Sequence, residues 1–106
     1  MRPNEQRQES RVGLELPVQI SIGSQLTLHG MLKDVSAKSA FITMKSSVYL
    51  QNNDEVGFLI RLSPDSDTHI IEGLARISRI AVGEGMAIYF TKMDDGSVSR
   101  LRDLLR

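Results

Sequence analysis

The stretch Leu14-Glu15-Leu16-Pro17-Val18-Gln19-Ile20-Ser21-Ile22-Gly23-Ser24 alternates apolar and polar residues from Leu16 to Ile22. Successive side chains of a β-strand point to opposite faces, so this period of two predicts a strand with one buried face and one exposed face. Gly23 and Ser24 then supply a tight hairpin turn. The return strand is expected over residues 25–33, where Gly30 interrupts the alternation and predicts a bulge or a bend.

Further strands and one helix follow along the chain. Residues 40–44, 55–62, 69–80 and 86–91 carry strand patterns and are separated by polar or glycine-containing turns. The end of the chain differs, because apolar residues recur at helical spacing from about Ser97 to the C-terminus. This order predicts a mainly β fold, a small antiparallel β-barrel of about six strands with a C-terminal α-helix.

Length and composition restrict the class of protein. The chain has 106 residues, enough for one domain, which we divide into a flexible N-terminal arm (1–13) and the barrel with its helix (14–106). Formal net charge is zero, so bulk binding to duplex phosphates is not expected. There is no cysteine, no signal peptide is predicted, and no apolar run approaches the ~20 residues that span a bilayer. We expect a cytoplasmic protein with no membrane insertion.

Two arginines in the polar arm are the first candidate site residues. Arg7 and Arg11 stand four residues apart, a spacing that puts both on one face in either a helix or an extended chain. A guanidinium fork matches a phosphate or the edge of guanine with two parallel hydrogen bonds. The alternative is a solvated arm in which these arginines pair loosely with Glu5 and Glu9.

The second candidate is the polar turn Asp34-Val35-Ser36-Ala37-Lys38-Ser39 between two apolar runs. In the functional interpretation, Asp34 accepts hydrogen bonds from guanine donors while Ser36 and the loop backbone contribute further polar groups. In the structural interpretation, the Asp and Ser side chains bond back to the backbone of their own turn.

Taken together, these segments resemble the PilZ domain family, bacterial receptors for cyclic di-GMP. The family carries Arg-x-x-x-Arg followed by (Asp/Asn)-x-Ser-x-x-Gly, and this chain has Arg7-x-x-x-Arg11 and Asp34-x-Ser36-x-x-Ser39. The segments 73–77 and 85–90 are similar to the last two strands of the family, and the helix that follows is also similar. The resemblance implies that Arg7, Arg11, Asp34, Ser36 and Ser39 bind cyclic di-GMP.

Ser39 departs from the family pattern, which has glycine at this position. Glycine can serve there because the backbone needs a positive φ, or because the ligand must approach where a Cβ would stand. The two reasons have different consequences, and both remain open at this point.

The resemblance implies a stand-alone receptor that orders its arm around cyclic di-GMP and relays the signal to an unidentified protein effector. The alternative is a degenerate adaptor that binds no nucleotide and acts through protein contacts. An oligonucleotide-binding barrel is disfavoured, because aromatic residues make up only 5% of the chain and no basic groove is evident, so no DNA or RNA partner is expected. We expect no enzyme, no cofactor and no metal, since His29 and His69 stand alone on their strands.

Overall fold

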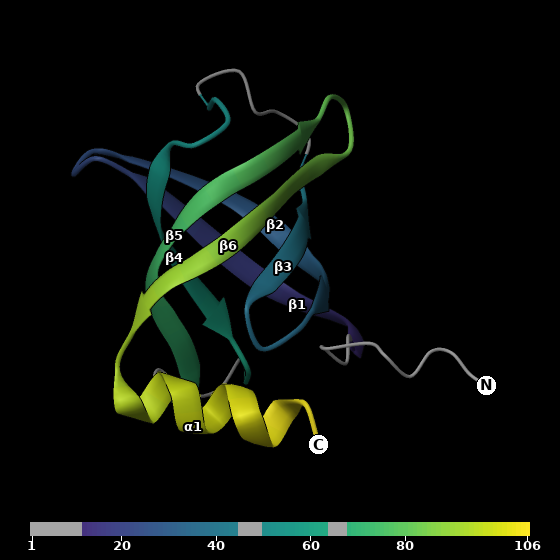
Figure 1. The fold of residues 1–106 in the computed structure, drawn as a ribbon, viewed down its shortest axis with the longest axis vertical. Helices are drawn as coiled ribbons and strands as arrows, with labels where there is room; N and C mark the ends of the chain where they lie inside the picture. Colours follow the sequence, from purple (N-terminus) through teal and green to yellow (C-terminus); the bar gives the residue numbers. More distant parts are fainter. Residues whose placement is uncertain (1–11, 45–49, 64–67) are drawn as a thin grey trace.

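The computed structural model describes residues 12–44, 50–63 and 68–106. Within these residues, six antiparallel strands close into one barrel and one helix lies across an end of it (Figure 1). The elements are β1 (Val12–Ile22), β2 (Leu26–Val35), β3 (Ser39–Thr43), β4 (Glu55–Arg61), β5 (Ile70–Ala81), β6 (Gly85–Met93) and α1 (Asp95–Leu104). The predicted fold class is confirmed.

Strand β1 closes the barrel, because it pairs with β2 along its whole length and with β4 over Val18–Ser21. It begins at Val12, two residues before the start expected from the sequence pattern. Pro17 pairs with Met31 of β2 but lies just outside the ladder with β4. A residue without an N–H is tolerated best at such a place, where one side of the strand is not yet paired.

The alternation seen in the sequence separates the core from the surface. Val18 and Ile20 are fully buried, and Leu16 and Ile22 pack against the same core from its two ends. Every strand contributes buried apolar residues, and Phe58 and Phe90 meet inside with ring centroids 4.9 Å apart. The period-two pattern therefore predicted the inward face correctly.

Gly30 marks a close approach of two strands rather than a bulge. The β1–β2 register runs unbroken through the pair Val18 and Gly30, so of the bulge or bend predicted there, the bulge is wrong. A Cβ at Gly30 would lie 2.5 Å from the Thr43 carbonyl oxygen, which explains why the position is glycine. In β2 the irregularity falls instead between Leu32 and Asp34, in the pairing with β3.

The helix begins at Asp95, earlier than the start expected near Ser97. Asp94 is the N-cap, and its Oδ1 accepts a hydrogen bond of 2.7 Å from the Ser97 backbone N–H. Both polar and apolar contacts fix α1 to the barrel. The buried Ser97 hydroxyl accepts from the Glu72 N–H at 3.0 Å, Arg100 Nε donates to the Ile70 carbonyl at 2.6 Å, and Leu101 enters the core. Helix and barrel therefore form one packed unit.

The cap gives a testable pH dependence. The Ser97 backbone N–H and then the Ser97 hydroxyl, helped by the charge of Arg100, hold the pKa of Asp94 below its ordinary value. Because folding lowers this pKa, the cap stabilises the protein above the ordinary carboxyl pKa of about 3.9 and is lost as pH falls through the lowered value. We expect Asp94→Ala to lower the Tm at pH 7, with a gap to the parent chain that shrinks as the pH falls below the ordinary carboxyl pKa.

Asp95→Ala is the matched control, because it removes a carboxylate from the same first turn without removing the cap. Thermal melts of the three proteins across this pH range make the measurement. A gap for Asp94→Ala that is the same at every pH would contradict the assignment.

Candidate ligand-binding site

The polar turn predicted as a site connects β2 to β3. Asp34 is the second-last residue of β2, Ser36 follows the strand, and Ser39 opens β3. The turn is tied to the barrel on its far side as well, since the Phe90 N–H of β6 donates to the Lys38 carbonyl at 2.9 Å. All three predicted residues of the second motif therefore lie in one ordered corner of the barrel.

Ser36 is fully buried and uses its hydroxyl inside the turn. Its Oγ accepts from the backbone N–H groups of Ser39 at 3.2 Å and Lys38 at 3.3 Å. The same Oγ lies 3.3 Å from the Ser39 carbonyl oxygen, to which it can donate, and the Ser36 N–H donates to that carbonyl at 2.8 Å. The structural interpretation thus describes Ser36, whose contacts hold the turn in shape.

Ser39 has ordinary extended backbone. Among the described residues, the only non-glycine residue with a positive φ is Asn53. A need for left-handed backbone therefore does not apply at Ser39, and the serine costs no such strain. Its Oγ lies 3.2 Å from Ser36 Oγ, so the serine adds a hydroxyl to the corner where the family motif has glycine. Of the two reasons left open by the sequence, only the space available to a ligand remains.

Asp34 is half-buried and lies between two strands. Its register partners are Gly13 of β1 and Phe41 of β3. A carboxylate offers two acceptor oxygens, the chemistry that the paired donors of a guanine require. Gly13 carries no side chain, which keeps the β1 side of this position uncrowded.

Arg7 and Arg11, with most of the arm, lie outside the described residues. The structure does describe the point at which the chain following Arg11 enters the barrel. Val12 pairs with Val35, one residue from Asp34 and one from Ser36. The chain therefore joins the barrel directly beside the polar turn.

Sequence reasoning missed a cluster on the outer face next to this turn. The Phe41 ring lies under two cations, with Lys33 Nζ 5.9 Å and Arg79 Cζ 6.0 Å from its centroid. Tyr89 of β6 pairs with Ser39 and is 51% exposed. No local signal reveals this cluster, because registers across β2, β3, β6 and β5 bring its members together.

Two arginines of β5, Arg76 and Arg79, have different surroundings. Arg76 donates from Nη1 to the Asn53 carbonyl at 2.9 Å. Arg79 belongs to the cluster around Phe41. Of the two, Arg79 has the environment that suits an anionic ligand.

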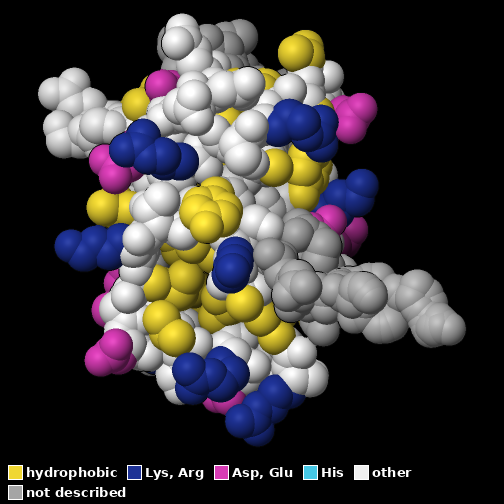
Figure 2. All heavy atoms as spheres, in the orientation of Figure 1, with side chains coloured by type: hydrophobic (Ala, Val, Ile, Leu, Met, Phe, Trp, Pro, Cys, Tyr) yellow, Lys and Arg dark blue, Asp and Glu magenta, His cyan; other side chains and the backbone are white. Residues whose placement is uncertain are grey.

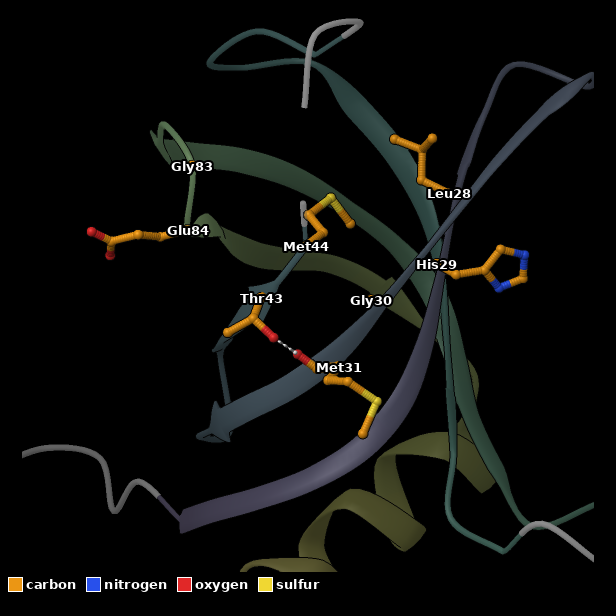
Figure 3. Close-up of a pocket in the computed structure, with 8 residues that line it drawn as sticks. All are labelled: Leu28, His29, Gly30, Met31, Thr43, Met44, Gly83 and Glu84. Atoms are coloured by element: carbon orange, nitrogen blue, oxygen red, sulfur yellow. Dashed lines mark hydrogen bonds between the residues drawn. The ribbon is translucent and has the colours of Figure 1, made fainter. Parts of the chain in front are cut away.

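A hollow of about 530 Å³ lies elsewhere on the barrel, lined by the middle of β2, the end of β3 and the β5–β6 turn (Figure 3). His29 and Glu84 both line it, yet Figure 3 shows their side chains pointing away from one another and outwards. Its polar groups do not converge, and its lining residue Met44 is the last described residue before 45–49. We therefore place the candidate site at the polar turn.

Within the described ranges, no group of three or more His, Cys, Asp or Glu side chains is placed to hold a metal ion. The helix present there is too short and too polar to cross a membrane.

A closed barrel with a terminal helix and a polar turn at the end of its second strand defines a small β-barrel domain. The PilZ domain family model matches residues 5–106, so the chain belongs to the PilZ domain family. Domains of this family are receptors and adaptors rather than enzymes. No curated protein matches the chain in sequence.

Three solved structures are similar in fold. The inhibitor of motility MotI (DgrA) of Bacillus subtilis has a TM-score of 0.77 at 22% identity over 99% of this chain and 54% of its own. The PilZ domain of CeSA from a cellulose-synthesizing bacterium has a TM-score of 0.66 at 21% identity, covering 91% of this chain and 94% of its own. The PilZ domain of Escherichia coli YcgR, solved with c-di-GMP, has a TM-score of 0.72 at 13% identity, covering 93% and 88%. The chain thus spans about half the length of MotI.

The buried hydroxyl network of the turn can be tested by stability. Ser36→Ala leaves the Lys38 and Ser39 N–H groups without their acceptor, so we expect the free energy of unfolding to fall by ~1–3 kcal/mol. Ser78→Ala is the control, because it removes an exposed hydroxyl that donates to one carbonyl, and a change within about 0.5 kcal/mol is expected. Urea unfolding measures both, and equal losses would show that the Ser36 network does not hold the turn.

Proposed function

We propose that this chain binds cyclic di-GMP on the surface beside the 34–39 turn and relays the signal to a protein partner in the bacterial cytoplasm. The observation that carries the proposal is the pairing of Val12 with Val35. Consecutive Cα atoms are 3.8 Å apart, so Arg11 starts one residue from a strand position that borders the turn. Arg7 is four residues further, at most about 14 Å of extended chain from Arg11.

The ligand chemistry supports this arrangement. Cyclic di-GMP presents two phosphates and two guanines, which call for guanidinium forks, a carboxylate acceptor and flat surfaces for stacking. Arg7 and Arg11 supply forks, and Asp34 supplies the carboxylate. Arg79 and Lys33 add positive charge around Phe41, and Tyr89 exposes a ring beside Ser39. The YcgR domain, which is similar in fold, was solved with cyclic di-GMP, the ligand proposed here.

Binding would fix arm residues on the barrel, and this ordering is the signal that a partner reads. Fixing each residue costs about 1–2 kcal/mol of backbone entropy, so the arm folds down only while the ligand holds it.

A second candidate function is an adaptor that binds no nucleotide. Ser39 favours it, since the added Oγ stands within 3.2 Å of Ser36 Oγ in the corner where the family motif has glycine. If a guanine needs that space, the serine excludes it, and the domain would act through protein contacts alone.

The arginine pair is tested by calorimetric titration of cyclic di-GMP into the parent chain, Arg7→Ala and Arg11→Ala. Each variant loses one bidentate contact worth ~1–3 kcal/mol, so we expect binding to weaken about tenfold or more. Arg2→Ala is the matched control, because it removes an arginine of the same arm outside the motif, and a change of about twofold at most is expected. Equal losses of affinity in Arg2→Ala and in the two motif variants would show that the arm contributes only unspecific positive charge.

Ser39→Gly separates the two candidate functions. Because Ser39 has no positive φ, the substitution relieves no left-handed strain. It removes the Oγ that lies 3.2 Å from Ser36 Oγ and opens that space to a ligand. If the parent chain binds cyclic di-GMP, we expect Ser39→Gly to change the affinity by less than about tenfold. A parent chain that gives no thermal shift with cyclic di-GMP, together with a variant that gives one, would instead assign the adaptor function to the serine.

A further inference from the structure

A second surface feature lies next to the polar turn, between the turn and α1. It is a groove of about 260 Å³ lined by Ala37, Val98, Leu101, Arg102, Leu105 and Arg106. All six are described residues. Figure 2 shows hydrophobic side chains gathered just above α1 on this side of the molecule, bordered by Lys and Arg side chains.

The helical wall of the groove is one continuous stripe. Val98, Leu101 and Leu105 fall at positions i, i+3 and i+7, which lie along one face of a helix. The stripe is only partly covered, because Leu101 is 3% exposed whereas Val98 is 39% exposed. Ala37, on the turn, forms the opposite wall and adds only a methyl group. An apolar channel therefore runs beside α1 with room for side chains of another segment.

The charged residues that line the channel are all cations. Arg102 and Arg106 stand four residues apart on α1, and both line the groove. Asp103 contacts Arg106 at 3.9 Å, but both side chains are about 70% exposed, so this pair neutralises little. The exposed Lys38 follows Ala37 in the turn. In a chain of zero net charge, this edge carries a local positive excess.

We propose that the groove binds an acidic amphipathic helix of a partner protein, apolar side chains in the channel and carboxylates against Arg102 and Arg106. A helix lying along α1 can put residues at i, i+3 and i+7 into the channel and flank them with charges, the usual way in which helices occupy apolar grooves. The cationic rim selects acidic over basic partners, because like charges brought together oppose docking.

This inference does not rest on nucleotide binding. The groove is formed by residues of α1 and by Ala37, which lies in the 34–39 turn but is not among the residues proposed to contact cyclic di-GMP. Experiments without the dinucleotide therefore test the groove alone, and their failure leaves the proposed receptor function standing.

The test uses the full chain labelled with nitrogen-15 and a synthetic peptide of about fifteen residues. The peptide carries leucines at i, i+3, i+4 and i+7 flanked by glutamates, and a control peptide has lysine in place of every glutamate. We expect amide signals of residues lining the groove to shift with the acidic peptide, and at least about tenfold weaker binding of the basic one.

Two protein variants sharpen the test. Val98→Asp puts a carboxylate in the channel and should weaken the binding of the acidic peptide at least about tenfold. Leu74→Asp is the matched control, since Leu74 of β5 is 38% exposed and does not line the groove, and it should leave binding unchanged. The double variant Arg102→Glu/Arg106→Glu should reverse the preference, binding the basic peptide more tightly than the acidic one. Reversal of preference requires a folded groove, so it remains informative if Val98→Asp does not fold.

Several results would overturn the proposal. They are shifts outside the groove, no binding of the acidic peptide, equal binding of both peptides, equal losses in Val98→Asp and Leu74→Asp, or an unreversed preference in the double variant. The alternative occupant of the groove is a second copy of this chain, and sedimentation of the chain without peptide measures whether it forms a dimer. A dimer that is broken by Val98→Asp and kept by Leu74→Asp would assign the groove to that copy instead.

Discussion

Closure of the sheet through β1 is the constraint on which the rest of the structure depends. Over Val18–Ser21 this strand bonds to β2 on one side and β4 on the other, so these positions have no free edge. A closed barrel also fixes which residues point inward, because a slip of one residue would turn the core face to solvent. The strict alternation from Leu16 to Ile22 satisfies that demand, and the α1 residue Leu101 completes the core at one end.

Closure also determines what the surface can do. Once registers are fixed, residues distant in sequence form rows across neighbouring strands. One row joins Asp34, Phe41, Ala87 and Arg79, and another joins Ser39, Tyr89 and Arg76. The carboxylate, the rings and the cations beside the turn are therefore consequences of strand pairing. The turn itself is shaped by one buried hydroxyl, and its Ala37 reaches the groove beside α1, so two surfaces share one short, ordered segment.

Sequence reasoning succeeded where the signal is local. Alternation predicted the strands and their buried faces. A polar turn was correctly predicted around Ser36, although Asp34 lies in β2 and Ser39 in β3. Sequence reasoning failed where the cause lies across the fold. Gly30 needs its glycine because the Thr43 carbonyl approaches it, and no neighbour of Gly30 in the sequence indicates that. The helix starts earlier than predicted because Asp94 caps it through the Ser97 N–H. Several polar residues precede the helix, and the sequence does not show which of them is the cap. The contact between the Ser97 hydroxyl and β5 helps to decide it. Phe41 with Lys33 and Arg79 was missed because registers alone create it.

Zero net charge places a limit on how this protein can recognise an anion. Exposed charges are screened beyond roughly 8–10 Å at physiological salt, so a neutral chain attracts distant phosphates weakly. Recognition must come from cations held at the contact surface. The barrel provides such places, since Lys33 and Arg79 flank Phe41 while Arg102 and Arg106 border an apolar groove. Each cation lies beside an apolar surface, where a bound ligand would exclude water and strengthen the attraction. Specificity at the two proposed sites would therefore depend on shape and contact geometry more than on total charge.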